Sequence, residues 1–409
     1  MAQPLGLTSS DVVFSEATPE QRQLTWELNG EAWAAPMSLD DYVRREQHLA
    51  QQELNRDGGC RYWVLYLKGY PRQIIASCEA TRKPALISNG HGGPARDGYG
   101  YAVTNVYTNP TWRRQGMAAF LLHRVQEQID ADSDFSVLYS DSGRNYYANL
   151  GWPAVPSRQA TLTLLAPPSP SQNQSPNQTP ASPTHNNTII AFTPSNPSRT
   201  RPLQPDDLRD LCELDELYLN TRFDSLLPAD KKVHVAFLPT HASISWHLAR
   251  SAFDARKLFP ADRAGPAPLN AGAITASGRA WIYWAHDWRA ERLRVLRIAR
   301  AAVADGLGAA EEEEERLRDV GALLEAALAE AARCGLAKGV VVWNPDEAVT
   351  LGCKAVGNAF AGSGAARGEG VEVKVVFNER LDGGIPSLRW KGGKGEAVVW
   401  EEHYGYCWC

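Results

Sequence analysis

The chain lacks the features that mark secreted, membrane-spanning and zinc-binding proteins. Its seven cysteines include no Cys-x-x-Cys pair, so their spacing predicts neither a zinc site nor a disulfide framework. No apolar run approaches the ~20 residues needed to cross a bilayer. The first residues have neither the basic start nor the apolar core of a signal peptide. We therefore expect a protein of a reducing, cytoplasmic compartment that uses no metal and no membrane.

An excess of basic residues is also missing. The chain has 42 Lys and Arg against 47 Asp and Glu, a net charge of −5, which argues against nucleic-acid binding as its main function. Hydrophobic residues make up 44% and charged residues 22%, an ordinary balance for globular domains. A length of 409 residues favours two domains.

A low-complexity segment separates two halves of the chain. Residues 167–200 are rich in Pro, Ser, Asn, Gln and Thr, and such a segment buries too little apolar surface to offset its ordering entropy. We predict a linker there, between one domain at 1–166 and another at 201–409.

One basic, glycine-containing loop joins a predicted strand to a predicted helix. Val103–Thr108 is rich in β-branched residues and predicts a strand, which Asn109-Pro110 ends. A helix with an apolar face begins at Gly116. Free backbone amides at a helix start, two arginines and a glycine together favour binding of an anion such as pyrophosphate. The alternative is a surface turn that is merely basic.

The loop sequence 113–118 resembles the Arg/Gln-x-x-Gly-x-Gly/Ala signature of the GNAT superfamily of N-acetyltransferases. The resemblance implies acetyl-CoA as co-substrate and an α/β (α+β) GNAT fold with a mixed, splayed central sheet. It implies that the pantetheine arm pairs with the main chain of Val106, Tyr107 and Thr108. The pyrophosphate would then lie on Arg113, Arg114, Gln115, Gly116, Met117 and Ala118.

The predicted elements of the first half follow the GNAT order. Alternation and capping signals predict strands at 11–14, 62–67, 73–79, 103–108, 135–140 and 160–165, and helices at 21–31, 38–54, 116–129 and 144–150. The strand at 160–165 is expected to close the sheet. The polar, glycine-rich segment 88–100 could serve as a lid over a binding cleft.

Acetyl transfer needs a base for the amine and gains from an acid for the departing thiolate. The stretch 146–152 is similar to the Phe-Tyr-x-x-x-Gly-Phe motif of GNATs, which implies that Tyr147 protonates the thiolate. Asn145 would contact the cofactor arm. The alternative for Tyr147 is a core tyrosine with a satisfied hydroxyl.

Two carboxylates are candidates for the base. Glu79 ends the strand before the lid-like segment, and Asp141 follows the strand 135–140. Each could take the proton directly or through a water. The alternative for each is a strand-end charge that faces solvent.

The second half repeats a similar order of elements without the signature loop. Strands are expected at 271–275, 280–286, 293–298 and 340–343, and helices at 205–222, 243–258 and 317–334. The acidic run Glu311–Glu315 fits a solvated loop or a helix start. We expect a second, degenerate GNAT-like domain that shapes the acceptor site and binds no cofactor.

Several longer sequence segments resemble the fungal L-lysine N6-acetyltransferases of lysine degradation. These segments are 78–85, 103–108, 138–141, 387–390 and 403–409. The resemblance implies transfer of acetyl from acetyl-CoA to the ε-amine of free L-lysine, by direct attack in a ternary complex. An arginine would suit the substrate carboxylate, and the candidates are Arg82, Arg389 and Arg279. The aromatic C-terminal segment could wall the pocket or pack as a strand in the second half.

Two other functions stay open at the level of sequence. One is acetylation of a protein or peptide lysine or N-terminus, for which the acidic run at 311–315 is the hint. The other is a non-catalytic acyl-CoA-binding scaffold. The sequence predicts no particular oligomeric state.

Overall fold

The computed structural model describes residues 8, 10–88, 94–165, 190–226, 230, 232–259, 269–301, 308–361, 371–391 and 397–409. The chain divides into two compact units, which comprise Met1–Ser157, Arg209–Gly265 and Glu379–Cys409 in the first and Arg158–Leu208 and Pro266–Asn378 in the second. The units therefore exchange segments across the boundaries predicted at residues 166 and 201. Residues 89–93 of the lid-like segment and 167–189 of the predicted linker lie outside the described residues.

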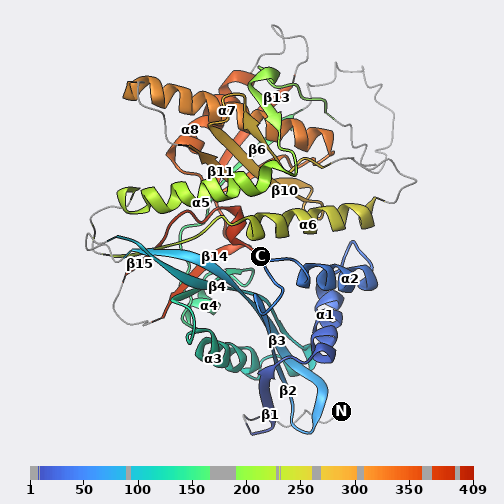
Figure 1. The fold of residues 1–409 in the computed structure, drawn as a ribbon. Helices are drawn as coiled ribbons and strands as arrows, with labels where there is room; N and C mark the ends of the chain where they lie inside the picture. The colour runs from blue at the N-terminus through green and yellow to red at the C-terminus, as the bar shows by residue number, and fades with distance from the viewer. Residues whose placement is uncertain are drawn as a thin grey trace, which may run out of the picture. The chain divides into compact units, whose positions relative to one another are not determined.

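The first unit is a mixed α/β layer structure (Figure 1). Its strands are β1 (Val12–Glu16), β2 (Cys60–Leu67), β3 (Tyr70–Ser88), β4 (Arg96–Thr108), β5 (Phe135–Ser140), β8 (Val233–Phe237), β14 (Ile385–Trp390) and β15 (Val398–Trp400). They pair in the order β1-β2-β3-β4-β5-β14, with β8 beside β3 and β15 beside β8. Its helices are α1 (Pro19–Trp33), α2 (Leu39–Ala50), α3 (Met117–Ile129), α4 (Asn145–Ala148), most of α5 (Asp207–Leu226) and α6 (His241–Leu258).

Helices cover both faces of this sheet. The α3 side buries a core that includes Leu121, Val125 and Trp63, and the α1–α2 side buries Trp26, Tyr42 and Tyr62. Figure 1 shows α3 and α1 on opposite sides of the strands. The neighbours Tyr62 and Trp63 face different cores because successive strand side chains alternate.

The predicted starts of α1 and α2 match their caps in the structure. The Thr18 hydroxyl oxygen accepts a hydrogen bond from the backbone N–H of Gln21, and the Gln21 side-chain oxygen accepts one from the backbone N–H of Thr18. Ser38 caps α2 through the backbone N–H of Asp41. These local bonds satisfy amides that the first turn of a helix leaves free.

Strands β4 and β5 separate at the centre of the sheet. They pair in parallel only from Gly100 opposite Phe135 to Val103 opposite Leu138, while β5 continues along β14 to Ser140. On its other edge β4 carries a bulge, because Ser77 pairs with Tyr107 but Glu79 pairs with Thr104. The sheet is thus splayed, and the β4 backbone beyond Val103 has no β5 partner.

The two units exchange strands. The prediction that 160–165 closes the first sheet is wrong, because β6 (Arg158–Leu165) pairs antiparallel with β12 (Val340–Trp343) in the second unit. The place beside β5 is taken by β14, with Leu388 opposite Val137. The C-terminal segment likewise belongs to the first unit, where Trp408 stacks on His247 of α6 at 5.9 Å between ring centroids. Packing of this segment in the second half is therefore contradicted.

The second unit is also a mixed sheet with helices. Its strands pair in the order β13-β6-β12-β11-β10-β9-β7, the others being β7 (Thr200–Pro202), β9 (Gly272–Thr275), β10 (Ala280–Asp287), β11 (Arg292–Arg300) and β13 (Glu372–Glu379). Its helices are α7 (Ala309–Arg333) and α8 (Glu347–Phe360). The first begins eight residues before the helix predicted at 317–334, and the second was not predicted. The acidic run is the start of α7.

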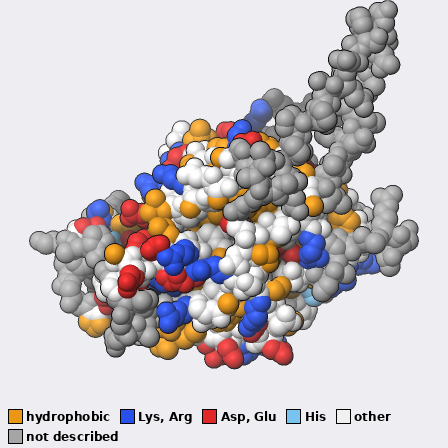
Figure 2. Space-filling view, turned by 90° about the horizontal axis from the view of Figure 1, so that it is seen from above, with side chains coloured by type: hydrophobic (Ala, Val, Ile, Leu, Met, Phe, Trp, Pro, Cys, Tyr) orange, Lys and Arg blue, Asp and Glu red, His pale blue; other side chains and the backbone are white. Residues whose placement is uncertain are grey.

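Charges on the described surface are mixed rather than segregated. Arg318 of α7 pairs with Glu314 and Glu315, and Arg199 pairs with Glu315 and Asp319. Figure 2 shows one face on which basic and acidic side chains lie close together. Within the described ranges, every helix is too short or too polar to cross a bilayer.

Candidate active site

An open pocket of about 580 Å³ lies in the first unit, at the splayed end of β4. Its walls come from the end of α1, from β4, from the loop before α3 and from the segment around α4. They are formed by Ala32, Trp33, Val106, Tyr107, Thr108, Trp112, Arg113, Arg114, Gly116, Met117, Ala118, Ala119, Ser142, Tyr146 and Tyr147. The volume falls within the usual range for small-molecule sites.

Most of the residues predicted to hold the cofactor line this pocket. They are Val106, Tyr107, Thr108, Arg113, Arg114, Gly116, Met117 and Ala118. Gln115 belongs to the same loop but is not part of the wall, and Asn145 is exposed at the first turn of α4. Their roles toward a cofactor stay predictions.

The loop between β4 and α3 ends at a glycine, which directly precedes the helix. Gly116 precedes α3 with φ of +76° and makes no side-chain cap to the first turn. A Cβ at Gly116 would meet no atom within 4 Å, so the space in front of the helix is open. Arg113 is held against the strand end by its Nε–H, which donates to the Thr108 carbonyl at 3.1 Å. This geometry suits a phosphate group.

Tyr147 lies in the pocket wall with its ring against the α3-side core. Burial raises the pKa of its hydroxyl well above the ordinary value, and the neighbouring Tyr146, Cys78 and Asp141 raise it further. The ring of Tyr146 meets it edge-on at 5.0 Å. Tyr147 is therefore protonated at neutral pH, as a proton donor must be.

Glu79 is a partly buried carboxyl group on the α1 side of the sheet. It accepts a hydrogen bond from the indole Nε1–H of Trp26 at 3.2 Å. Burial, and after it the charge of Glu46, raises the pKa of Glu79 to about 7, although hydrogen bonds from Asn105 and Trp26 oppose the rise. A carboxyl group with this pKa can take a proton near neutral pH.

The bulge in β4 contains a residue that bonds to Glu79 and is followed by a residue of the pocket wall. Asn105 has φ of +50° and its side chain bonds to Glu79, while the next residue, Val106, lines the pocket. A β-bulge redirects a side chain in this way because it adds one residue to one strand. Glu79 itself is not part of the pocket wall.

Asp141, the second candidate for the base, bonds to the backbone of a neighbouring segment. Its Oδ1 accepts a hydrogen bond from the backbone N–H of Gly384 at 2.9 Å, just before β14. The side chain is exposed and is not part of the pocket wall. Its role as a base stays a prediction.

Sequence reasoning missed the contribution of α1. Trp33 lines the pocket and its ring meets Tyr107 edge-on at 6.1 Å, and Trp26 bonds to Glu79. The spacing of seven residues between the two tryptophans indicates one helix face. Their partners on β3 and β4 could not be found from that spacing. The other missed wall residues are Ala32, Trp112, Ala119, Ser142 and Tyr146.

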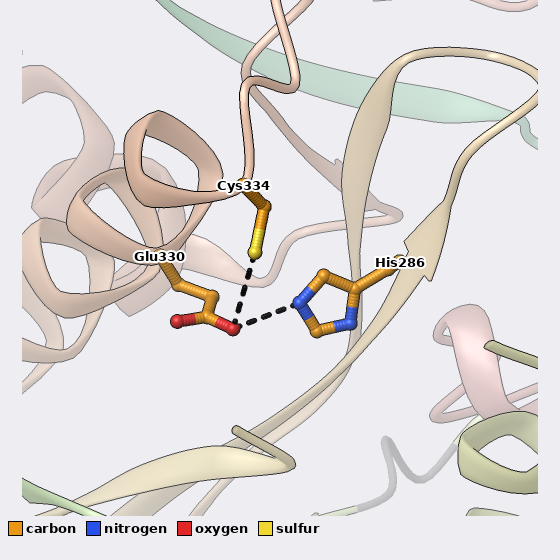
Figure 3. A group of neighbouring side chains, drawn as sticks. All are labelled: His286, Glu330 and Cys334. Atoms are coloured by element: carbon orange, nitrogen blue, oxygen red, sulfur yellow. Dashed lines mark hydrogen bonds and ion pairs between the residues drawn. The ribbon is translucent and has the colours of Figure 1, made fainter. Parts of the chain in front are cut away.

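A second polar cluster is buried in the other unit. Figure 3 shows His286 and Cys334 directed at one oxygen of Glu330, at 2.9 Å from the imidazole Nε2 and 3.6 Å from the thiol Sγ. These are metal-ligand types. However, Arg333 also donates two hydrogen bonds to Glu330, at 2.7 and 2.9 Å. Burial, followed by the charge of Glu330, raises the pKa of Cys334 to about 12, so the cluster fits a hydrogen-bonded core.

The first unit combines three features: a splayed sheet, a bulged strand and a helix start that can receive phosphate. Together with a carboxyl group of pKa about 7 and a largely buried tyrosine, they are the features expected of an acyltransferase site of the GNAT type. The position of the site is set by β4 and α3.

Comparisons with known proteins agree with this class. Residues 180–409 match the family described as the LYC1 GNAT-like C-terminal domain. A lysine acetyltransferase of Yarrowia lipolytica is 24% identical over 311 residues, which are 70% of this chain and 76% of the relative. An uncharacterized protein of Saccharomyces cerevisiae, YGR111W, is 24% identical over 97% of this chain and 98% of its own length.

A solved structure has a similar fold. It is the N-myristoyltransferase of Saccharomyces cerevisiae with bound myristoyl-CoA and inhibitors, at a TM-score of 0.50 and 11% identity, covering 96% of this chain and 82% of that one. The chain belongs to the LYC1 GNAT-like family, and it is an N-acetyltransferase. The predicted fold class and family resemblance are confirmed.

Proposed function

We propose that this protein transfers the acetyl group of acetyl-CoA to the ε-amine of free L-lysine, by direct attack in a ternary complex. The observation that carries the proposal is the carboxyl group of Glu79, whose pKa is raised to about 7 and which bonds to Asn105, the residue before Val106 of the pocket wall. The similarity to a lysine acetyltransferase supports the choice of acceptor. A role in cytoplasmic lysine degradation is part of the same proposal.

In this proposal Glu79 removes the first proton. The lysine ammonium is not nucleophilic until it loses a proton, and a carboxylate with pKa about 7 accepts it more readily than an ordinary carboxylate does. The neutral amine then attacks the thioester carbonyl and forms the new C–N bond. Trp26 and Asn105 orient the carboxylate through their hydrogen bonds.

The β4 backbone and Tyr147 act on the acetyl donor. Beyond Val103 the β4 edge has no β5 partner, so its amides are available to the pantetheine arm and the carbonyl oxygen. When the C–S bond breaks, Tyr147 donates its proton to the departing thiolate. The products are N6-acetyllysine and CoA.

The test is acetyl transfer by the purified full chain. With acetyl-CoA and L-lysine we expect CoA release and a product acetylated at the side-chain nitrogen, identified by mass spectrometry. A panel of other amines and a lysine-containing peptide serve as comparison acceptors. Turnover of the peptide or another amine, with no turnover of L-lysine, contradicts the proposed acceptor. Binding of acetyl-CoA without transfer to any acceptor favours the scaffold alternative.

A further inference from the structure

One face of α1 carries an arginine between two aromatic rings. The guanidinium carbon of Arg22 lies 5.2 Å from the centre of the Trp26 ring and 4.9 Å from that of Tyr62. Such stacking holds the planar guanidinium in place while leaving its N–H groups free to donate. Arg22 is half-buried, so a ligand can still reach it.

Arg22 has no carboxylate of its own. Its Nε–H is buried without a hydrogen-bond partner, and no ion pair to it occurs within the described ranges. The arginines predicted from sequence to bind the substrate carboxylate are different: Arg389 makes a bidentate pair with Asp130, at 2.6 Å for both contacts, and Arg82 pairs with Asp132 at 3.6 Å. The third, Arg279, lies in the second unit. An arginine without an ion pair, stacked between two aromatic rings, is a candidate contact for an anionic ligand.

The position of Arg22 relative to Glu79 is set by Trp26. The indole that stacks beside Arg22 is the one that donates to Glu79 at 3.2 Å, and the positive charge of Arg22 lowers the pKa of Glu79. The proposed base and the guanidinium therefore contact the same tryptophan ring, the carboxylate at its Nε1–H and the guanidinium over the ring.

The face of α1 that carries Arg22 also carries a hydrogen-bond acceptor without a partner in the described part of the chain, one turn or more toward the end of the helix. Asn29 follows Arg22 by seven residues, and its Oδ1 is buried without a hydrogen-bond partner among the described residues. Seven residues span about 10 Å of helix axis. The carboxyl carbon and the ε-nitrogen of an extended lysine are roughly 7 Å apart, since three bonds of an extended chain span 3.3–3.6 Å. A lysine side chain is therefore long enough to reach from one residue to the other.

We infer that Arg22 binds the carboxylate of the acceptor, held between Trp26 and Tyr62, while the acceptor amine lies between Glu79 and Asn29. This inference rests on the proposed function and narrows its substrate class. The acceptor is an amino acid with a carboxylate about 7 Å from the reacting nitrogen. A lysine within a peptide lacks that free carboxylate.

The experiment compares two acceptors with one variant. Arg22→Met keeps a long side chain against the rings and removes the charge. The substrates are L-lysine and 1,5-diaminopentane, which is lysine without its carboxylate. We expect KM for L-lysine to rise about 10- to 100-fold because a charge-assisted hydrogen-bond pair is lost, with kcat changed only a few-fold. We expect kcat/KM for 1,5-diaminopentane to stay unchanged.

Arg61→Met is the matched control. Arg61 also stacks on a ring, at 4.4 Å from Trp63, but it pairs with Glu16 and lies one residue from Tyr62, on the opposite face of β2. Its loss should leave both acceptors unaffected. Assays at pH 8.5 keep Glu79 ionised in every variant, so a change in its pKa does not mimic the effect.

The outcomes separate this inference from the proposed function. If wild-type protein acetylates L-lysine but Arg22→Met lowers kcat/KM equally for both acceptors, or for neither, Arg22 is not the carboxylate-binding residue. If wild-type protein acetylates no free amino acid, the proposed function itself fails. A variant that keeps the wild-type Tm and acetyl-CoA affinity shows that α1 is intact.

Discussion

Gly116 leaves open the space before α3 in which we expect the phosphate to bind, and a negatively charged side chain there would repel it. Gly116→Glu should weaken acetyl-CoA binding at least 10-fold, because a carboxylate would stand before the amides of α3 and φ of +76° strains any side-chain-bearing residue. Isothermal titration with acetyl-CoA measures the effect. Gly69→Glu is the matched control, since Gly69 has φ of +81° and equally open surroundings in the turn between β2 and β3. Unchanged affinity in Gly116→Glu contradicts the loop assignment.

Glu79 controls the pH dependence in our proposal. With a pKa of about 7 the carboxyl is protonated at lower pH and cannot act as a base, so kcat/KM should rise with pH up to about 7 and then level off. Glu79→Gln should lower kcat about 10²- to 10⁴-fold and remove this rise. Because a raised pKa means that folding disfavours the charged form, the variant should not lower Tm above pH 7. A wild-type pH profile in Glu79→Gln points to another base.

Tyr147 is tested by removal of its hydroxyl. Tyr147→Phe keeps the ring in its core contacts and should lower kcat about 10²-fold with little change in acetyl-CoA affinity, since only the proton for the thiolate is lost. Rates with acetyl-CoA and with a thioester of a more acidic thiol give a second readout. The better leaving group should reduce the defect. Equal defects with both donors contradict the role of Tyr147 as an acid.

Sequence and structure agree best where residues act locally. The loop at Gly116 could be predicted because a strand, a proline stop and a helix start are written in one continuous stretch. The partners of Glu79 could not, because Trp26 is 53 residues away and Asn105 reaches it only through a bulge. Arg22 gave no signal at all, since its rings come from two different elements.

At the scale of elements, β14 is joined to α3 by one ion pair. Asp130, at the end of α3, receives two hydrogen bonds from Arg389 of β14, and the two side chains are 26% and 17% exposed. Arg389→Met should reduce the free energy of unfolding by about 1–3 kcal/mol, because hydrogen bonds to a charged, partly buried partner are lost. Chemical denaturation measures this. An unchanged stability together with a raised KM for lysine would restore Arg389 as a substrate contact.

Helices were easier to predict than strand partners. The caps at Thr18 and Ser38 are local signals, and they located α1 and α2 closely. The strands β6 and β14 also have clear apolar patterns, but a pattern of alternation says which face is buried and does not name the neighbouring strand. The strand at 160–165 was therefore predicted correctly as a strand but assigned to the wrong sheet.

At the scale of the whole molecule, the exchange of strands determines what can fold alone. Residues 1–166 should not form a stable domain, because they lack β14 beside β5 and β8 beside β3 and carry β6 without its partner β12. We expect this fragment to bind a hydrophobic dye and to unfold without a cooperative transition. The full chain is the control. A fragment that unfolds cooperatively and binds acetyl-CoA would support the boundary predicted at residue 166.

The same exchange has a consequence for biosynthesis. On the ribosome β5 emerges long before β14, and at about 5–20 residues per second the wait is roughly ten seconds or more. During that time one edge of β5, a strand with five buried residues, Phe135–Leu138 and Ser140, has no partner. The nascent chain must keep this edge from other chains until translation is nearly complete. Its yield in cells should therefore depend on chaperones that bind extended apolar segments and on the speed at which the second half is translated.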